Sequence, residues 1–142
     1  MNEPWSIQLF GGLRCQQQER VISRFRTHTS GALLAYLSFH LHRTHPREEL
    51  IVLLWPDADT TPGRNRLKQD LASLRRQLEP PGVASGSVLF ADRAHVRLNP
   101  AAVTTDVAAF EAALRAATHA PHVAARIVHL REATALYQGE LL

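Results

Sequence analysis

The chain has few of the features that membrane, secreted or zinc-binding proteins need. It contains a single cysteine, Cys15, which excludes an internal disulfide and a multi-cysteine zinc site. No apolar run reaches the roughly 18 residues of a membrane span. The first ten residues, MNEPWSIQLF, lack the basic and apolar regions of a secretory signal. We therefore expect a cytoplasmic protein that makes no contact with a membrane.

Catalytic motifs are missing as well. The sequence has no Gly-rich phosphate loop, no serine elbow and no close pair of carboxylates on a plausible pocket. His40, His42 and His45 lack a neighbouring carboxylate or cysteine to complete a metal site, so we interpret them as surface or packing residues. Cys15 has no basic activator nearby and is expected to be a structural thiol. We expect neither an enzyme nor a cofactor.

The charge of the chain is unevenly distributed. The 142 residues are 45% hydrophobic and 20% charged, which is typical of one compact domain or one domain plus part of a second. Seven basic and three acidic residues lie between Thr61 and Asn99, whereas three basic and four acidic residues follow from Pro100 onward. A local basic region favours a polyanion such as nucleic acid. The alternative is an ordinary solvated helix face.

The order of predicted elements is three short strands, three helices and a hairpin. Residues 5–10 alternate apolar and polar side chains, and shorter runs at 13–15 and 21–25 complete an antiparallel meander. A first helix is expected to start at Thr29 or Ser30. A second has Pro46 at its first position and an apolar run, ELIVLLW, that predicts burial on all sides. Two apolar runs between 88 and 98 predict the hairpin.

The third helix, predicted over 62–78 with Thr61 as its cap, has two different faces. Leu67, Leu71, Leu74 and Leu78 form one apolar stripe. The opposite side is polar and basic, and we expect Asp70 at its edge. Such a face suits the major groove, because Gln or Asn can pair with adenine and Arg or Lys can reach guanine or phosphate. The pattern predicts an α+β winged helix-turn-helix.

The predicted hairpin corresponds to the wing of such a domain. Arg93 lies in its turn, where a wing tip meets the minor groove. We expect Val88, Phe90, Val96 and Leu98 to face the core, with His95 and Arg97 pointing outward.

The segment from FRTHTSGALLAYL through REELIVLLWP to GRNRLKQDLASLRRQL resembles the DNA-binding domain of Streptomyces antibiotic regulatory proteins (SARPs). Its winged helix is similar to that of response-regulator effector domains. The later segment VRLNP…TTDVAAFEAAL resembles the start of the bacterial transcriptional activation domain (BTAD) that follows in this family. The resemblance covers residues 5 to 142 and implies a transcription regulator that binds double-stranded promoter DNA, often at direct repeats, and recruits RNA polymerase. Tandem or homodimeric binding on DNA is expected with it.

The resemblance also assigns roles to individual residues. Lys68, Gln69 and Ala72 match base-facing positions of the family. The connector PDADTT matches a loop that touches polymerase, which makes Asp57 and Asp59 candidates. The wing departs from the family pattern, because FADRAH stands where many members have a PPGY-like segment. With the remaining basic residues of the helix, the expected DNA-backbone contacts are Arg64, Asn65, Arg66, Ser73, Arg75 and Arg76.

Two alanine-rich helices are expected after the wing. Thr104 or Thr105 caps the first, whose apolar stripe includes Val107, Phe110 and Leu114, and the second has Ile127, Leu130, Ala133 and Tyr137 on one face. They resemble one helical-repeat (TPR-like) hairpin, and a single repeat rarely buries its apolar face alone. We therefore expect a winged-helix domain over 1–99 and the first helices of a second domain over 100–142, the chain being either a fragment or a naturally short member of the family. The alternative function is a protein-interaction module that does not read DNA.

Overall fold

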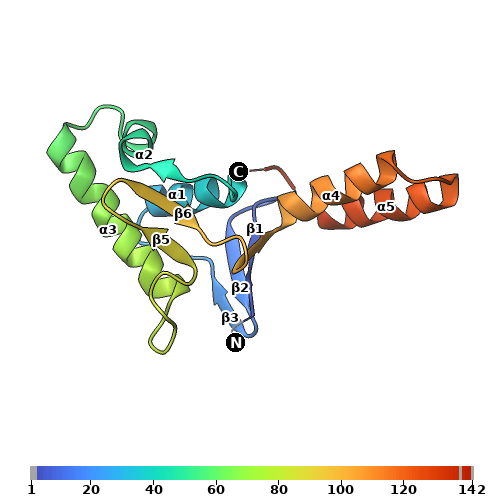
Figure 1. Ribbon diagram of the computed structural model, residues 1–142, viewed down its shortest axis with the longest axis horizontal. Helices are drawn as coiled ribbons and strands as arrows, with labels where there is room; N and C mark the ends of the chain where they lie inside the picture. Colours follow the sequence, from blue (N-terminus) through green and yellow to red (C-terminus); the bar gives the residue numbers. More distant parts are fainter. Residues whose placement is uncertain (1–2, 138, 142) are drawn as a thin grey trace.

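The computed structural model describes residues 3–137 and 139–141, which form two sheets and five helices. At one end of the molecule the long helix α3 (Thr60–Leu78) lies beside a hairpin, and at the other end two helices extend side by side away from the rest (Figure 1). This architecture confirms the predicted α+β winged helix followed by a helical pair.

The N-terminal sheet has the strand order β3-β2-β1-β7. The three predicted strands pair antiparallel, as expected. The fourth strand was not predicted: it pairs parallel to the first, with Ile7 opposite Thr105, and so returns to the sheet after the wing. These strands are β1 (Trp5–Gln8), β2 (Arg14–Gln17), β3 (Arg20–Ile22) and β7 (Val103–Thr105).

The helices α1 (His28–Phe39), α2 (Arg47–Leu54) and α3 begin slightly differently from the sequence prediction. The cap of α1 is Thr27, whose side chain accepts a hydrogen bond from the backbone N–H of Ser30 at 3.0 Å. Pro46 precedes α2 instead of opening it, and belongs to the short strand β4 (His45–Pro46). Asp59 is the cap residue of α3, so the predicted helix 62–78 starts two residues earlier.

The leucine stripe of α3 is buried as predicted. Leu67, Leu71, Leu74 and Leu78 are each at most 5% exposed and belong to the main core. Trp5 ties the C-terminal end of this helix to the N-terminal sheet, because its indole Nε1 donates to the backbone oxygen of Leu78 at 3.1 Å. The core therefore fixes which face of α3 looks outward.

The expectation that α2 is buried on all sides is wrong. Leu50 and Ile51 are buried, whereas Val52 is 67% and Leu53 is 50% exposed. The helix has only eight residues and packs on the domain along one side. Its apolar composition therefore exceeds what the core can cover.

The contact between α2 and α3 depends on Gly63. A Cβ built at Gly63 would lie 2.7 Å from Cγ2 of Ile51, closer than carbon atoms can approach without rearrangement. We therefore expect Gly63→Ala to lower the free energy of unfolding by about 1–3 kcal/mol through overpacking, although alanine is the better helix former. Chemical denaturation measures the change. In an Ile51→Ala background, Gly63→Ala should be nearly neutral, because the clashing Cγ2 atom is gone. Additive losses of stability from the two substitutions would contradict the contact.

The two C-terminal helices are α4 (Asp106–Thr118) and α5 (Val123–Leu136). Thr105 caps α4 by accepting a hydrogen bond from Ala108 N–H at 3.0 Å, as predicted. The carboxylate of Asp106 accepts hydrogen bonds from the backbone N–H groups of Leu9 at 2.8 Å and Phe10 at 3.0 Å. The start of α4 is thereby attached to the N-terminal sheet.

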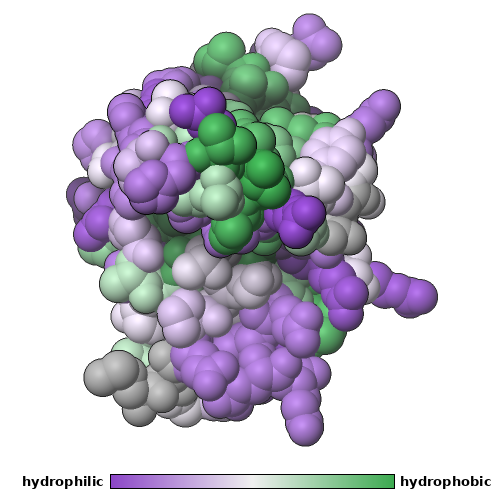
Figure 2. Space-filling view, turned by 90° about the vertical axis from the view of Figure 1, so that its right-hand side faces the viewer, coloured by the Kyte–Doolittle hydropathy of each residue, from purple (hydrophilic) through white to green (hydrophobic). Residues whose placement is uncertain are grey.

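Much of the predicted apolar face of this helical pair is open to solvent. Val107 and Ala133 are buried and Phe110 is partly buried, whereas the other predicted members are 39–54% exposed. Figure 2 looks at this end of the molecule and shows apolar side chains gathered there. The exposed members of the two predicted stripes are Leu114, Ile127, Leu130 and Tyr137.

Candidate nucleic-acid interface

The outward face of α3 presents most of the residues predicted to contact DNA. Gln69 and Lys68 lie one turn on from Asn65 and Arg64, on the side away from the buried leucines. Arg64 is paired with Glu48, its Nε lying 3.0 Å from the carboxylate, in a contact between two exposed side chains. The predicted residues that are exposed on this face are Arg64, Asn65, Arg66, Lys68, Gln69, Ala72 and Arg76.

Two residues predicted to contact the DNA backbone have other surroundings. Ser73 is only 7% exposed, so its hydroxyl is not on the surface. Arg75 is directed to the end of its own helix, where it donates to Glu79 at 2.8 Å and to Ser85 at 3.1 Å. The helical periodicity placed both residues near the outward face because it carries no information about their contacts with other parts of the chain.

Asp70 is buried in place of lying at the edge of the exposed face. It is 2% exposed and accepts hydrogen bonds from Ser30 Oγ at 2.6 Å and from Arg26 at 3.1 Å. The same arginine donates to Oε1 of Gln69 at 3.0 Å. Sequence reasoning did not single out Arg26, since it lies more than forty positions away from both partners.

The wing consists of β5 (Leu89–Ala91) and β6 (His95–Leu98), and β4 pairs with the latter strand. Arg93 and His95 are exposed at and beside the turn, as predicted. Asp92 shapes this turn by accepting hydrogen bonds from the backbone N–H groups of Ala94 at 2.8 Å and His95 at 2.7 Å. These hydrogen bonds hold the pKa of Asp92 below its ordinary value.

The prediction that Phe90 faces the core is wrong by one residue. Leu89 is fully buried, whereas Phe90 is 41% exposed and stands opposite Arg97 on the neighbouring strand. The guanidinium carbon of Arg97 lies 5.4 Å from the centre of the Phe90 ring, a cation–π contact. Arg97 is therefore exposed as predicted, on a supporting aromatic ring.

A buried carboxylate attaches the wing to the end of α3. Glu79 accepts hydrogen bonds from the backbone N–H groups of Gly86 at 3.0 Å, Val88 at 2.8 Å and Leu89 at 2.8 Å. Burial raises the pKa of Glu79, but the three N–H groups and Arg75 outweigh it, so the pKa lies below its ordinary value. This charged side chain therefore adds to the shared core in holding the wing against the end of α3.

The connector between α2 and α3 exposes the predicted polymerase-contact candidates. Asp57 and Asp59 are both open to solvent. Asp59 caps α3 by position only, because its side chain makes no capping hydrogen bond.

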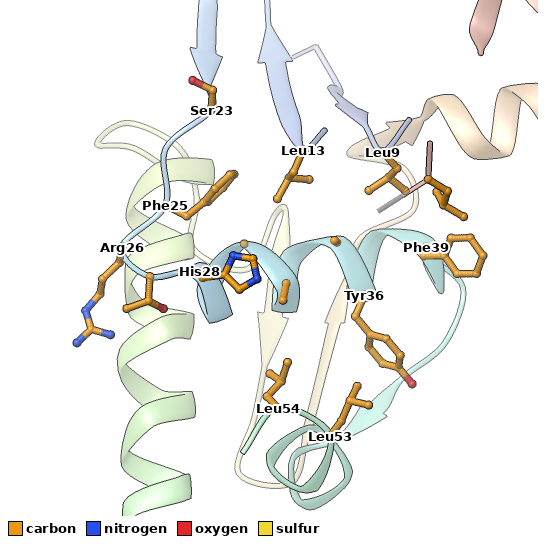
Figure 3. A pocket seen from close by; sticks show the side chains of 15 residues that line it. Leu9, Leu13, Ser23, Phe25, Arg26, His28, Tyr36, Phe39, Leu53 and Leu54 are labelled. Atoms are coloured by element: carbon orange, nitrogen blue, oxygen red, sulfur yellow. The ribbon is translucent and has the colours of Figure 1, made fainter. Parts of the chain in front are cut away.

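A half-open apolar cavity of about 930 Å³ lies beside α1 (Figure 3). It is lined by side chains from α1, from the end of α2 and from the segments that follow the strands β1 and β3, and it contains none of the residues predicted to contact DNA. Its larger apolar members are Leu9, Leu13, Phe25, Tyr36, Phe39 and Leu54.

Of the residues set aside as structural, Cys15 and His45 are buried, His40 is partly buried and His42 is exposed. Burial raises the pKa of Cys15 to about 12, which keeps the thiol protonated. His45 is fully buried beside Tyr36 and His40, and burial lowers its pKa. Within residues 3–137 and 139–141, no cluster of three potential ligands could hold a metal ion. No helix in this described part has both the length and the hydropathy of a membrane span.

These elements define a winged helix-turn-helix with an outward basic helix, a class found in transcription regulators. No family description and no curated protein sequence matches the chain. Among solved structures, Mycobacterium tuberculosis EmbR, determined in complex with a low-affinity phosphopeptide, is similar to it with a TM-score of 0.85 and 25% sequence identity. The match covers 99% of this chain and 38% of the EmbR chain.

EmbR is a regulator of the SARP family. Over nearly its whole length the chain is therefore similar to a regulator with a SARP-type winged-helix domain, and the resemblance predicted from its sequence is confirmed. The chain spans about two fifths of the length of the regulator that it matches.

Proposed function

We propose that the protein is a sequence-specific DNA-binding transcription regulator that inserts α3 into the major groove. The observation that carries this proposal is the outward face of α3, on which Lys68, Gln69 and Ala72 are exposed while the leucine stripe is buried. Basic side chains at the rims of that face suit phosphates, and small or amide side chains at its centre suit base edges.

The remaining contacts follow from the same placement. Arg64, Asn65, Arg66 and Arg76 are proposed to contact the DNA backbone. At the wing, Arg93 is proposed to reach the minor groove, with His95 and Arg97 beside it. Arg75 and Ser73 are omitted, since one is paired with Glu79 and the other is buried.

We further propose that Asp57 and Asp59 contact RNA polymerase, and that copies of the protein bind direct repeats in tandem or as a homodimer. This proposal implies a regulatory role and not an enzymatic one, in the cytoplasm on the nucleoid. The division at residues 99 and 100 also remains a proposal. The strand β7 and Asp106 follow that boundary yet bond to the N-terminal sheet, which favours a winged-helix unit extending to the start of α4.

A second candidate function is the docking of a partner protein without DNA readout. The cavity beside α1 favours it, since exposed apolar side chains such as Phe39 and Leu53 border a hollow of about 930 Å³. Retarded migration of a promoter duplex in a gel, lost as salt is raised, would favour DNA binding over this candidate.

Substitutions on α3 distinguish sequence-specific base contacts from non-specific contacts to the DNA backbone. Gln69→Ala should weaken binding to the specific site, because a good base contact provides roughly 1–3 kcal/mol of discrimination, and should leave binding to scrambled DNA nearly unchanged. Arg76→Ala should weaken both by a similar factor, since a phosphate contact is independent of sequence. Fluorescence anisotropy on both duplexes measures the two affinities.

Leu71→Ala is the structural control. It should lower stability by roughly 2–5 kcal/mol through a core cavity, and reduce binding only as far as folding fails. If Gln69→Ala and Arg76→Ala both reduced the affinity for the specific and the scrambled duplex by the same factor, α3 would bind DNA without recognising its sequence.

A further inference from the structure

Arg26 lies between β3 and the start of α1, and contacts the predicted reading helix. Its side chain is 43% exposed. One terminal nitrogen donates to Oδ1 of Asp70 at 3.1 Å, and the other donates to Oε1 of Gln69 at 3.0 Å. In Figure 3 Arg26 stands at one end of the cavity, with its guanidinium directed away from the apolar lining and beside α3. The arginine therefore joins two neighbouring residues of α3 to a different part of the chain.

Asp70 fixes the position of this guanidinium. The carboxylate is 2% exposed and also accepts a 2.6 Å hydrogen bond from Ser30 Oγ. A buried carboxylate without a cation is strongly unfavourable, and Arg26 is its ion-pair partner. Because the guanidinium is planar and rigid, anchoring one nitrogen on Asp70 also sets where the second nitrogen lies.

The second nitrogen determines which end of the Gln69 amide faces inward. All N–H groups of a guanidinium are donors, so the amide atom that faces Arg26 must be the oxygen. The amide nitrogen Nε2 of Gln69 has no protein acceptor within the described part of the chain. The outward end of this exposed side chain is consequently a donor.

We propose that Arg26 is a positioning residue for base recognition, which presents Nε2 of Gln69 to the groove as a hydrogen-bond donor. This proposal rests on the proposed insertion of α3 into the major groove. The base that faces Gln69 must then supply an acceptor, and N7 is an acceptor on both purines. Bidentate pairing with adenine also requires Oε1 as an acceptor, which Arg26 occupies in part. The position is therefore read as purine and not as adenine alone.

The test uses the full chain and a binding site selected from random duplexes. The base pair that Gln69→Ala relaxes identifies the contacted position, and affinities are measured there with all four bases. For the unaltered chain we expect both purines to bind within about threefold of each other and about five- to tenfold more tightly than pyrimidines, the contribution of one hydrogen bond. Replacing the contacted purine by its 7-deaza analogue should remove that preference.

Arg26→Met should reduce the purine preference to about twofold or less, because the amide is then free to turn. In a Gln69→Ala background Arg26→Met should change the base preference no further. Arg26→Lys keeps a cation beside Asp70 but lacks the second nitrogen, so it should show the same loss while folding normally. The matched control is Arg24→Met, which removes an exposed arginine two residues away.

The outcomes separate this proposal from the one on which it rests. If Gln69→Ala relaxes one position and neither Arg26 variant does, the positioning role is overturned and DNA reading stands. If no duplex binds, the proposed function fails. The contact between Arg26 and Gln69 can then still be tested in the DNA-free protein. There, ¹⁵N relaxation of the Gln69 side-chain amide should show larger motion in Arg26→Lys than in Arg24→Met; equal motion would overturn the positioning role.

Discussion

Glu79→Ala is expected to lower the free energy of unfolding by about 3–5 kcal/mol, because it removes a buried carboxylate that accepts several hydrogen bonds. The carboxylate accepts hydrogen bonds from Gly86, Val88 and Leu89 and from the side chain of Arg75. Without it, the buried N–H groups of Val88 and Leu89 have no acceptor, and each such group costs roughly 1–3 kcal/mol. Denaturant titration followed by circular dichroism measures the loss.

The pH dependence of stability provides an independent measurement of the same contact. The pKa of Glu79 is lower in the folded protein than its ordinary value, so the unfolded state takes up a proton first as the pH falls. The stabilisation by Glu79 is therefore complete above the unfolded-state pKa and disappears as the pH falls through the folded-state pKa. Glu79→Ala should show a flatter stability curve than the unaltered chain across that acidic range.

Glu79→Gln is the matched control for the loss of charge. The amide oxygen retains one acceptor for the backbone N–H groups, so the loss of stability should be smaller than for alanine. The wing should also be less firmly attached to α3 in both variants, which hydrogen exchange at Val88 and Leu89 would detect. Unchanged exchange there in Glu79→Ala would contradict the role of the carboxylate.

The parts of the fold with strong local patterns were predictable from the sequence. The leucine stripe of α3 fixed its buried side because four leucines at helical spacing admit one orientation. The short strand β7 gave no such signal, since its three residues are defined by parallel pairing with Trp5, Ser6 and Ile7, nearly a hundred positions earlier. In the wing, Val88, Leu89 and Phe90 are all apolar, so alternation could not decide which of them faces inward.

The candidate site was predictable only where it depends on one helix. Periodicity identified Lys68, Gln69 and Ala72 as exposed, because their neighbours on α3 determine their direction. It misplaced Asp70 and Ser73, whose burial depends on segments distant in the sequence. Arg26 was missed for the same reason, since a contact between a loop and a helix more than forty residues later has no periodic signature.

DNA binding by the full chain is expected to weaken steeply with salt. Roughly four to seven phosphate contacts give log K a slope of about −4 to −6 against log salt. A rise from about 50 to about 200 mM salt then lowers the affinity by several hundredfold to a few thousandfold. Arg66, Lys68, Arg76 and Arg93 are exposed and make no ion pair within the described part of the chain, so their charges are free for phosphates.

Single substitutions show how much each cationic side chain contributes to the slope of log K against log salt. Arg76→Ala should reduce its magnitude by about one, the contribution of one phosphate contact. Arg75→Ala should leave the slope unchanged at equal folded fraction, because Arg75 is held by Glu79 and Ser85 at the end of the helix. The comparison is direct, since the two arginines are adjacent in sequence and differ only in their surroundings. A flat salt response would exclude nucleic acid as the main ligand. If Arg75→Ala and Arg76→Ala changed the slope equally, Arg75 would contact DNA in spite of its pairing with Glu79.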